Sequence, residues 1–384
     1  MTSTWKRLKG LPGRLLLLAV ATAVALLAAE ALVRWLAPQQ LIRLRPDVWT
    51  PDHEGLGWRM APDLDTVVNT GERDVVLRTD ADGHRVGAPS APASRQILAL
   101  GDSFLAAIEV GYADTMTARL EESVSATLGE RVRIVNAGVA GWDPNHYLLE
   151  LRRELARRDY DLVLVFVFRG NDIVARRQDV IPPKQGQVVH YLRWPRSLAP
   201  RELRKAWLYP VNDFLERRSH LFILVRQRSW HLLMRIGLSA RRFPVVELRS
   251  EATSQRWRVT ADLCADAAAE AGGHGIETLF VLLPGAYHVD PELGLAYAAT
   301  VGFGPDEVDL EQSSRILTAE LLKQGLRFVD LTTPLREARA AGVRTHGEID
   351  THLSPAGHAA VARELHESVL ELLRATSTQG SHPG

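Results

Sequence analysis

The chain has 384 residues, and its 46 basic side chains are matched by 46 acidic ones, so the formal net charge is +0. A neutral chain gives no overall case for nucleic-acid binding, and any electrostatic recognition must come from a local surface. Hydrophobic residues make up 46% of the chain, which is ordinary for a globular protein with a sizeable core. The single cysteine, Cys264, excludes an internal disulfide and a zinc site built from cysteines.

A basic and then apolar N-terminal segment predicts attachment to a membrane. Four basic residues precede an uncharged run from Leu15 to Ala29, and further apolar residues extend this run past Glu30. We expect a basic cytoplasmic segment at 1–14 and an uncleaved signal anchor at 15–37. The positive-inside rule then places the rest of the chain in the periplasm or outside the cell. Small residues around Ala29 also suit signal-peptide cleavage, so a secreted mature form is the alternative.

Short apolar strands alternate with amphipathic helices beyond a small β-rich preface at 38–94. We expect strands at 97–100, 132–135, 162–168, 276–283 and 328–331, and helices at 114–128, 145–158, 254–271, 310–323 and 355–373. This alternation is typical of a parallel sheet covered on both faces, which is an α/β fold. The main domain is expected to cover 95–374, and the tail at 375–384 is expected to be disordered.

The alternation is interrupted by an insertion at 174–250, in which basic residues outnumber acidic ones. Its apolar residues have helical spacing, which predicts a helix packed on the main domain or forming a lid. The basic surface has two interpretations that stay open: a solvated face, or a contact with anionic lipid head groups or acidic polysaccharide. The second is favoured by the interleaved aromatic residues Trp194, Trp207, Tyr209 and Trp230.

Polar residues follow three of the predicted parallel strands at the point where each strand ends. Ser103 follows the first strand in Gly101-Asp102-Ser103, Gly141 follows the second, and Asn171 follows the third. Because the carboxyl ends of parallel strands share one edge, the backbone N–H groups of Ser103 and Gly141 and the side-chain amide of Asn171 are predicted to converge. A serine nucleophile also needs a base and a group that orients it, and Asp350-Thr351-His352 offers both.

Taken in this order, the blocks resemble the SGNH (GDSL-type) hydrolase superfamily. The resemblance rests on Gly101-Asp102-Ser103-Phe104, 136–141, Gly170-Asn171-Asp172 and 350–358, and it covers roughly residues 95–374. It implies a flavodoxin-like three-layer α/β/α sandwich and ester chemistry through an acyl-serine intermediate, with no cofactor. Mapped residue by residue, it implies Ser103 as the nucleophile, His352 as the base, Asp350 as the orienting acid, and Gly141 and Asn171 as the oxyanion donors.

The last block departs from the usual family pattern, in which the aspartate stands three residues before the histidine instead of two. Some members associated with exopolysaccharide acetylation resemble this chain in carrying Asp-x-His. Three alternatives follow: Glu348 as the acid, a Ser103–His352 dyad, or a metal site at Asp350, His352 and His358. The remaining polar residues of the blocks have structural interpretations: Asp102 and Asp172 as turn-forming acceptors, and His358 as a packing or capping residue.

The sequence and the resemblance together predict a membrane-anchored serine esterase at the cell envelope. Its substrate is expected to be a short-chain or acetyl ester, carried by an envelope polysaccharide or lipid. Two other functions stay open. The first is an O-acyltransferase or O-acetyltransferase acting on an envelope polysaccharide, because water and a sugar hydroxyl attack the same acyl-serine. The second is a non-catalytic scaffold or glycan-binding module that keeps the fold and lacks an active site.

Overall fold

A computed structural model describes residues 11–43, 48–52, 54–87, 92–181, 211–235 and 247–379. An eight-stranded sheet forms its centre, and five neighbouring strands of this sheet are parallel. They are β6 (Arg95–Gly101), β7 (Val132–Gly138), β8 (Leu162–Phe168), β9 (Glu277–Leu283) and β10 (Phe328–Asp330). Their spatial order, β7-β6-β8-β9-β10, is the doubly wound order of flavodoxin-like proteins. The predicted α/β fold class is confirmed.

The parallel strands are apolar along their length because both faces of the sheet are covered. In β8, Val163 and Val165 pack into one hydrophobic cluster, whereas Leu164 and Phe166 pack into the other. Successive side chains of a strand point to opposite faces, so a strand covered on both sides has to be hydrophobic at every position. This explains why β8 could be located from a continuous apolar run.

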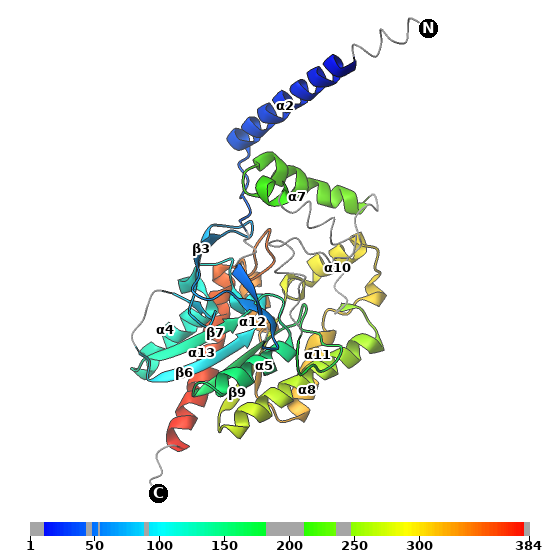
Figure 1. Ribbon diagram of the computed structural model, residues 1–384. Helices are drawn as coiled ribbons and strands as arrows, with labels where there is room; N and C mark the ends of the chain where they lie inside the picture. Colours follow the sequence, from blue (N-terminus) through cyan, green and yellow to red (C-terminus); the bar gives the residue numbers. More distant parts are fainter. Residues whose placement is uncertain are drawn as a thin grey trace, which may run out of the picture.

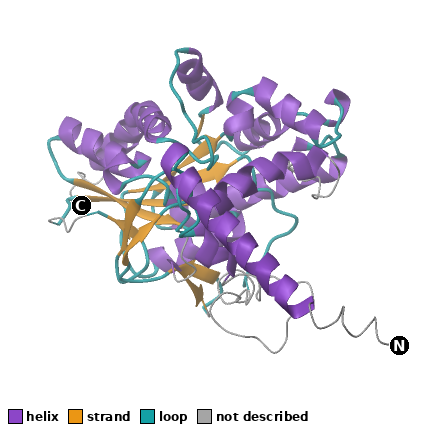
Figure 2. Ribbon diagram, turned by 90° about the horizontal axis from the view of Figure 1, so that it is seen from above, coloured by secondary structure: helices purple, strands orange, loops and turns teal. Residues whose placement is uncertain are grey.

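Helices form a layer on each face of the sheet (Figure 2). One layer consists of α5 (Pro144–Leu155), α8 (Glu251–Gly273) and α11 (Gln312–Lys323). The other consists of α4 (Met116–Leu128), α12 (Thr332–Ala340) and α13 (Pro355–Gln379). Several of these helices begin at residues that cap them: Thr115, Asp143 and Ser250 each accept a backbone N–H bond from the first turn. The result is the expected three-layer α/β/α sandwich.

Short helices occupy positions where no element was expected. They are α9 (Ala286–Val289), α10 (Pro291–Thr300) and α12, together with 3₁₀ turns at Tyr112–Asp114 and Pro305–Glu307. At the C-terminus, α13 continues to Gln379, into the segment 375–384 that was expected to be disordered. Residues 375–379 contain neither Gly nor Pro, so the helix has no reason to stop before Gly380.

Most of the β-rich preface belongs to the main sheet. Its strands β3 (Asp65–Val68), β4 (Val75–Thr79) and β5 (Arg85–Val86) form an antiparallel extension, and β5 joins the parallel part by pairing Arg85 with Asn136 of β7. The strands β1 (Trp49–Asp52) and β2 (Gly57–Met60) form a separate antiparallel hairpin. The preface is therefore packed beside the parallel strands that carry the candidate site.

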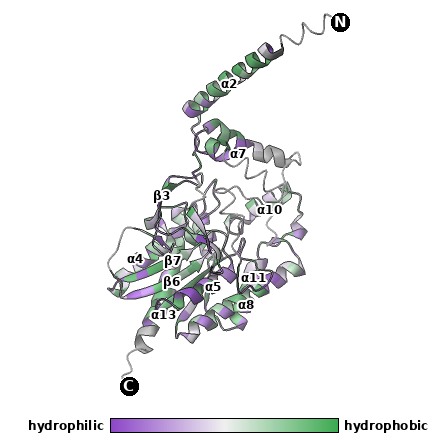
Figure 3. Cartoon of the chain, in the orientation of Figure 1, coloured by the Kyte–Doolittle hydropathy of each residue, from purple (hydrophilic) through white to green (hydrophobic). Residues whose placement is uncertain are grey.

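The N-terminal helix α2 (Leu11–Leu36) projects from the rest of the molecule (Figure 1), and its surface is hydrophobic (Figure 3). The most apolar 18-residue stretch of its segment Gly13–Leu36 has a mean hydropathy of 2.4 and is 0% buried, so by length and composition this helix is able to cross a membrane.

The insertion contributes a helix, α7 (His220–Arg235), which lies against the C-terminal end of α2 (Figure 1). The Glu30 carboxylate accepts bonds from the Ser219 hydroxyl at 2.7 Å and from the backbone N–H groups of His220 and Leu221, each at 2.9 Å. The aromatic residues Trp194, Trp207 and Tyr209, which were expected to lie on the basic surface, are outside the described residues.

Candidate active site

Ser103 lies at the carboxyl edge of the sheet, directly after β6. It is the first residue of the short helix α3 (Ser103–Ala106), and the preceding Asp102 caps this helix by accepting the Phe104 N–H at 2.9 Å. The prediction that Asp102 holds the turn is confirmed. The strand order reverses between β6 and β8, and such a switch point is where open α/β sheets bind ligands.

Ser103, His352 and Asp350 form a continuous chain of hydrogen bonds. The distance between Ser103 Oγ and His352 Nε2 is 2.8 Å. On the other side of the ring, His352 Nδ1 contacts Asp350 Oδ1. The same carboxylate oxygen accepts the backbone N–H of His352 at 3.3 Å. Residues 249 positions apart in the chain are thus joined in the arrangement that a serine nucleophile needs.

A tight loop brings Asp350 onto His352 despite the short spacing. The backbone N–H of Gly347 donates to the carbonyl of His352 at 2.9 Å, which closes the loop. Glu72 from the preface fixes its tip, because Glu72 Oε1 accepts the backbone N–H groups of Ile349 at 2.6 Å and Asp350 at 3.1 Å. The alternative acid, Glu348, is exposed and pairs with Arg344 at 2.7 Å.

The charges around His352 favour its protonated form. Burial lowers the pKa of His352, but the carboxylates of Asp350 and Glu109 outweigh it and raise the pKa to about 9. Burial also opposes ionisation of Asp350, yet its hydrogen bond with His352 holds the pKa of this carboxyl below its usual range. Asp350 therefore stays ionised at neutral pH and binds the imidazolium.

Gly141 and Asn171 lie in the loops after β7 and β8, as expected. Gly141 has φ +80°, a left-handed conformation that favours glycine. Its loop is fixed to the preface because Trp58 Nε1 donates to the carbonyl of Ala140 at 3.0 Å. Asn171 is exposed in its turn, and its backbone N–H donates to the Phe168 carbonyl at 3.3 Å. Their roles as oxyanion donors stay a prediction.

The neighbouring Asp172 is buried and holds the same turn. Its Oδ2 accepts the Phe168 N–H at 2.7 Å and the Tyr147 hydroxyl at 2.8 Å. Burial and the nearby Asp102 raise the pKa of Asp172 well above its usual value. The structural role predicted for Asp172 is confirmed.

A second carboxylate beside the site was not anticipated from the sequence. Glu109 is buried, and atoms of Glu109, Asp350 and His352 lie within 4.8 Å of one another. It follows a left-handed turn at Ala107, which has φ 50°. Arg85 holds this turn, because its guanidinium donates to three carbonyls. The distance is 2.7 Å to Ala106 O and 2.5 Å to Val110 O, and the third acceptor is Ala107 O.

Close packing also fixes the backbone behind Ser103. A Cβ atom at Gly138 would lie 2.4 Å from the backbone nitrogen of Ala106, so only glycine allows β7 to approach α3 this closely. Asn136 spans the same gap, since its side-chain amide donates to the Leu105 carbonyl at 2.9 Å. No motif marks Arg85 or Glu109, but Asn136 and Gly138 stand in the second block of the sequence resemblance, at 136–141.

Two further histidines lie in or near the last block, and both are buried. His358 is buried, and its Nδ1 accepts the backbone N–H of Met116 at 3.3 Å, at the start of α4. The capping role predicted for His358 is confirmed. Among the described residues, His358 is not grouped with Asp350 and His352 at metal-ligand spacing. The alternative of a metal site at these three residues is therefore not supported. His346 is also buried, and burial lowers its pKa to about 4.

A pocket of about 450 Å³ opens over Ser103 and His352. The main domain supplies Ala106, Ile108, Glu109, Ala140 and Asp350, the preface supplies Ile42, Trp49 and Thr70, and the insertion supplies Asn212, Glu216 and Arg226. The insertion therefore forms one wall of the site, as the predicted lid would. Because this wall joins α2 through Glu30, the site lies on the side of the domain from which α2 projects (Figure 1).

Comparison with protein-family models finds no match, and comparison with curated proteins finds none either. Solved structures do align with the chain. A lipolytic protein of the G-D-S-L family from Veillonella parvula is 13% identical over 71% of this chain and 97% of its own, with a TM-score of 0.37. An acetylxylan esterase from Geobacillus stearothermophilus, in a catalytic mutant form, is 11% identical over 74% and 96%, with a TM-score of 0.39. An alpha/beta hydrolase from the metagenome of Lake Arreo, Spain, is 13% identical over 74% and 98%, with a TM-score of 0.38.

Identities and TM-scores of this size leave the activity to be inferred from the residues of the chain's own site.

Proposed function

We propose that the protein is a serine esterase that cleaves short-chain acyl esters through an acyl-serine intermediate. The observation that carries the proposal is the chain of hydrogen bonds from Ser103 through His352 to Asp350. All three residues line one pocket. A serine hydroxyl becomes a nucleophile when a base takes its proton as it attacks, and His352 Nε2 is at the right distance to do so.

In the acylation half, neutral His352 accepts the Ser103 proton while Oγ bonds to the ester carbonyl carbon. The resulting oxyanion is held by the backbone N–H groups of Ser103 and Gly141 and by the Asn171 amide. The C–O bond to the alcohol then breaks, and His352 returns the proton to the leaving oxygen. In the second half, water attacks the acyl-serine and gives a proton to His352; the bond between the acyl carbon and Ser103 Oγ then breaks, and His352 returns the proton to Oγ, which releases the acid and the free serine. Asp350 orients the ring and stabilises the imidazolium in both halves.

The direct test is labelling of the purified full chain with a fluorophosphonate probe, together with hydrolysis of a short-chain aryl ester. Ser103→Ala is expected to abolish both, whereas Ser254→Ala, on the outer helix α8, is expected to keep both. Equal hydrolysis by the Ser103→Ala protein would contradict the proposal. Labelling without hydrolysis would indicate an activated serine with a different acceptor, and absence of labelling would favour a non-catalytic scaffold.

Acyl transfer to a polysaccharide hydroxyl is the second candidate, and the wall of the pocket favours it. Asn212, Glu216 and Arg226 line the same pocket as Ser103, and the Arg226 guanidinium pairs with the Glu216 carboxylate. Such groups are suited to bind a sugar hydroxyl that takes the place of water. With an acetyl donor and candidate glycans, mass spectrometry would show acetylated glycan if transfer occurs and free acetate alone if only hydrolysis occurs.

We infer that the site works at the outer surface of the membrane in which α2 is anchored. The support is the apolar surface of Gly13–Leu36 and the basic residues that precede it in the sequence. A reporter fused to the C-terminus, active only outside the cytoplasm, would test this orientation. A reporter active only in the cytoplasm would contradict it.

A further inference from the structure

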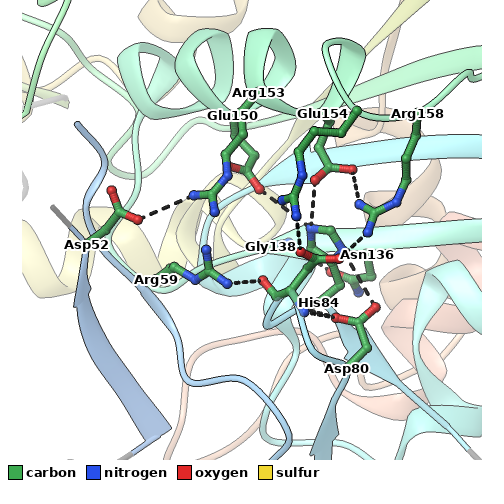
Figure 4. A network of polar contacts seen from close by, with 12 residues as sticks. Asp52, Arg59, Asp80, His84, Asn136, Gly138, Glu150, Arg153, Glu154 and Arg158 are labelled. Carbon is green, nitrogen blue, oxygen red and sulfur yellow. Dashed lines mark hydrogen bonds and ion pairs between the residues drawn. The ribbon is translucent and has the colours of Figure 1, made fainter. Parts of the chain in front are cut away.

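A buried polar cluster outside the pocket that contains Ser103 has an imidazole facing two glutamates. His84 lies in the turn between β4 and β5, and Glu150 and Glu154 lie one turn apart on α5 (Figure 4). All three residues are buried, with exposed fractions of 4%, 5% and 0%. Two carboxylates on one helix face, opposite an imidazole, are unusual in a protein interior because each charge has lost its hydration.

The atoms that face one another in this cluster are not hydrogen bonded. His84 Nε2 lies 3.5 Å from Glu150 Oε1 and 3.6 Å from Glu154 Oε1, beyond the usual range of a hydrogen bond. Within the described part of the chain, His84 Nε2, Glu150 Oε2 and Glu154 Oε1 are buried atoms that lack a hydrogen-bond partner. Buried polar atoms normally have partners, yet His84 Nε2 and Glu154 Oε1 lack them although they face each other, which requires an explanation.

We propose that His84, Glu150 and Glu154 form a binding site for one divalent transition-metal ion, of which Zn²⁺ is the best-fitting case. Ligand atoms bound to a tetrahedral zinc ion at its usual bond lengths lie about 3.4 Å apart, which is close to the observed separations. One atom from each of the three residues lies within 4.8 Å of the others. Imidazole nitrogen and carboxylate oxygen are both ordinary zinc ligands, and a water molecule would complete four-coordination.

Two of the three proposed ligands, His84 and Glu154, contact further polar groups of the kind that orient metal ligands in other proteins. Asp80 Oδ2 faces His84 Nδ1 at 3.7 Å, which is the position of a carboxylate that orients a ligating histidine. The other oxygen of Glu154 is held by Arg158 at 2.6 Å and by the Tyr160 hydroxyl. Glu154 Oε1 is thereby left to face His84.

The cluster is rich in carboxylates. In the described part of the chain, those of Asp80, Asp82, Glu150 and Glu154 pair with His84 or with the guanidinium groups of Arg133, Arg157 and Arg158, and Arg59 donates to the Asp82 carbonyl at 2.8 Å. Burial lowers the pKa of His84, but Asp80 and the two glutamates outweigh burial and raise the pKa to about 9. A metal ion binds the neutral imidazole, so its binding competes with a proton at His84.

A metal at this site would stabilise the turn that follows the candidate nucleophile, Ser103. The residue after His84 is Arg85, whose guanidinium holds the carbonyls of Ala106, Ala107 and Val110. Fixing His84 to α5 would hold Arg85, and through it the turn that follows Ser103. Asp80 and Asp82, in the same loop as His84, are partly exposed.

The test is a Zn²⁺ titration of the full chain, purified in detergent through a tag without histidine and first stripped with a chelator. We expect one ion per chain with a dissociation constant below about 1 μM, proton release on binding, and an X-ray absorption spectrum with one imidazole and oxygen ligands. Glu150→Gln and His84→Gln are expected to weaken binding at least about 100-fold, since each removes a ligand.

Two control variants separate this site from other zinc-binding groups. His274→Ala removes an exposed histidine, and His352→Ala removes the imidazole that lies near Glu109 and Asp350. Both are expected to keep the ion. Binding that disappears in His352→Ala and persists in His84→Gln would overturn the proposal, as would the absence of saturable binding to the stripped wild-type chain. The absorption spectrum of the wild type does not separate the two groups, because each offers one imidazole and two carboxylates, so Glu150→Gln compared with His352→Ala decides the question if His84→Gln fails to fold.

Discussion

Asp350 contacts Nδ1 of His352 although a single residue separates them in the chain. The contact is possible because the loop from Gly347 to His352 is closed by a backbone hydrogen bond, and because Glu72 binds the N–H groups at its tip. A spacing of two residues and a spacing of three can thus present a carboxylate to the same ring nitrogen. The arrangement supports a role for Asp350 as the group that orients His352.

Replacing Asp350 by Asn should lower kcat for a short-chain aryl ester by about 10³- to 10⁴-fold, because the amide no longer stabilises the imidazolium and favours the wrong tautomer. Glu348→Gln should leave kcat unchanged, since Glu348 pairs with Arg344 at the surface. Steady-state kinetics of both variants provide the measurement. A large loss in Glu348→Gln with normal activity in Asp350→Asn would reverse the assignment of the acid.

The pH dependence of the activity should report the charge of His352. Its pKa is raised to about 9, and the neutral ring is the base, so kcat/KM should rise with pH and level off above about pH 9. Glu109→Gln removes one of the carboxylates that raise this pKa, so the rise should move about one unit toward lower pH. The pH–rate profile of the variant measures the shift.

Glu122→Gln on α4 is the matched control, because Glu122 is exposed and remote from the pocket. Its profile should coincide with that of the wild type. A Glu109→Gln profile that also coincides with the wild type would show that Glu109 does not act on the base.

Much of the fold could be predicted from the sequence because its central strands are buried on both faces. The segment at 162–168 is apolar at every position, and β8 has these same bounds. The antiparallel extension was harder to predict, because β5 has only two residues and is joined to the parallel strand β7 by a single pair, Arg85 with Asn136. A strand that short has no hydrophobic period that sequence reasoning could detect.

The reactive residues of the candidate site follow strand ends or precede the last helix, so position and residue type suggested them. The residues that support them gave no such signal. Glu72 reaches Asp350 across 278 positions in the chain, and Glu109 is directed toward His352 by a left-handed turn at Ala107. Such contacts join residues that are brought together only by the tertiary structure, so they could not be predicted from a single sequence.

Asn171 should be needed for turnover if its amide stabilises the oxyanion. Asn171→Ala is expected to lower kcat by about 10²- to 10³-fold with little change in KM, because the bond forms in the transition state. Asn171→Asp should be at least as damaging, since a negative charge repels the oxyanion. Labelling of Ser103 by a fluorophosphonate at a normal rate in Asn171→Ala would argue against the amide as a donor.

Glu72 should act as a positioning residue for Asp350. Glu72→Ala removes the acceptor of two backbone N–H bonds, which are worth about 1 kcal/mol each, and should lower kcat about tenfold. Glu72→Gln keeps an acceptor oxygen and should restore most of the activity. A purely structural role would lower the melting temperature in Glu72→Ala while leaving the kcat of the folded protein and its pH profile unchanged.

The hydrogen bonds of Glu30 should hold the insertion against the C-terminal end of α2. Glu30→Ala removes the cap from the backbone N–H groups of His220 and Leu221, a loss of about 1 kcal/mol, so their amide exchange should become about five times faster. Hydrogen exchange with mass spectrometry of the protein in lipid nanodiscs measures this, and Glu122→Ala on α4 is the control. Because Asn212, Glu216 and Arg226 of the insertion line the pocket, KM should rise while labelling of Ser103 persists. Unchanged exchange at 220–221 would show that the insertion is held by other contacts, and the wall of the pocket would then not depend on α2.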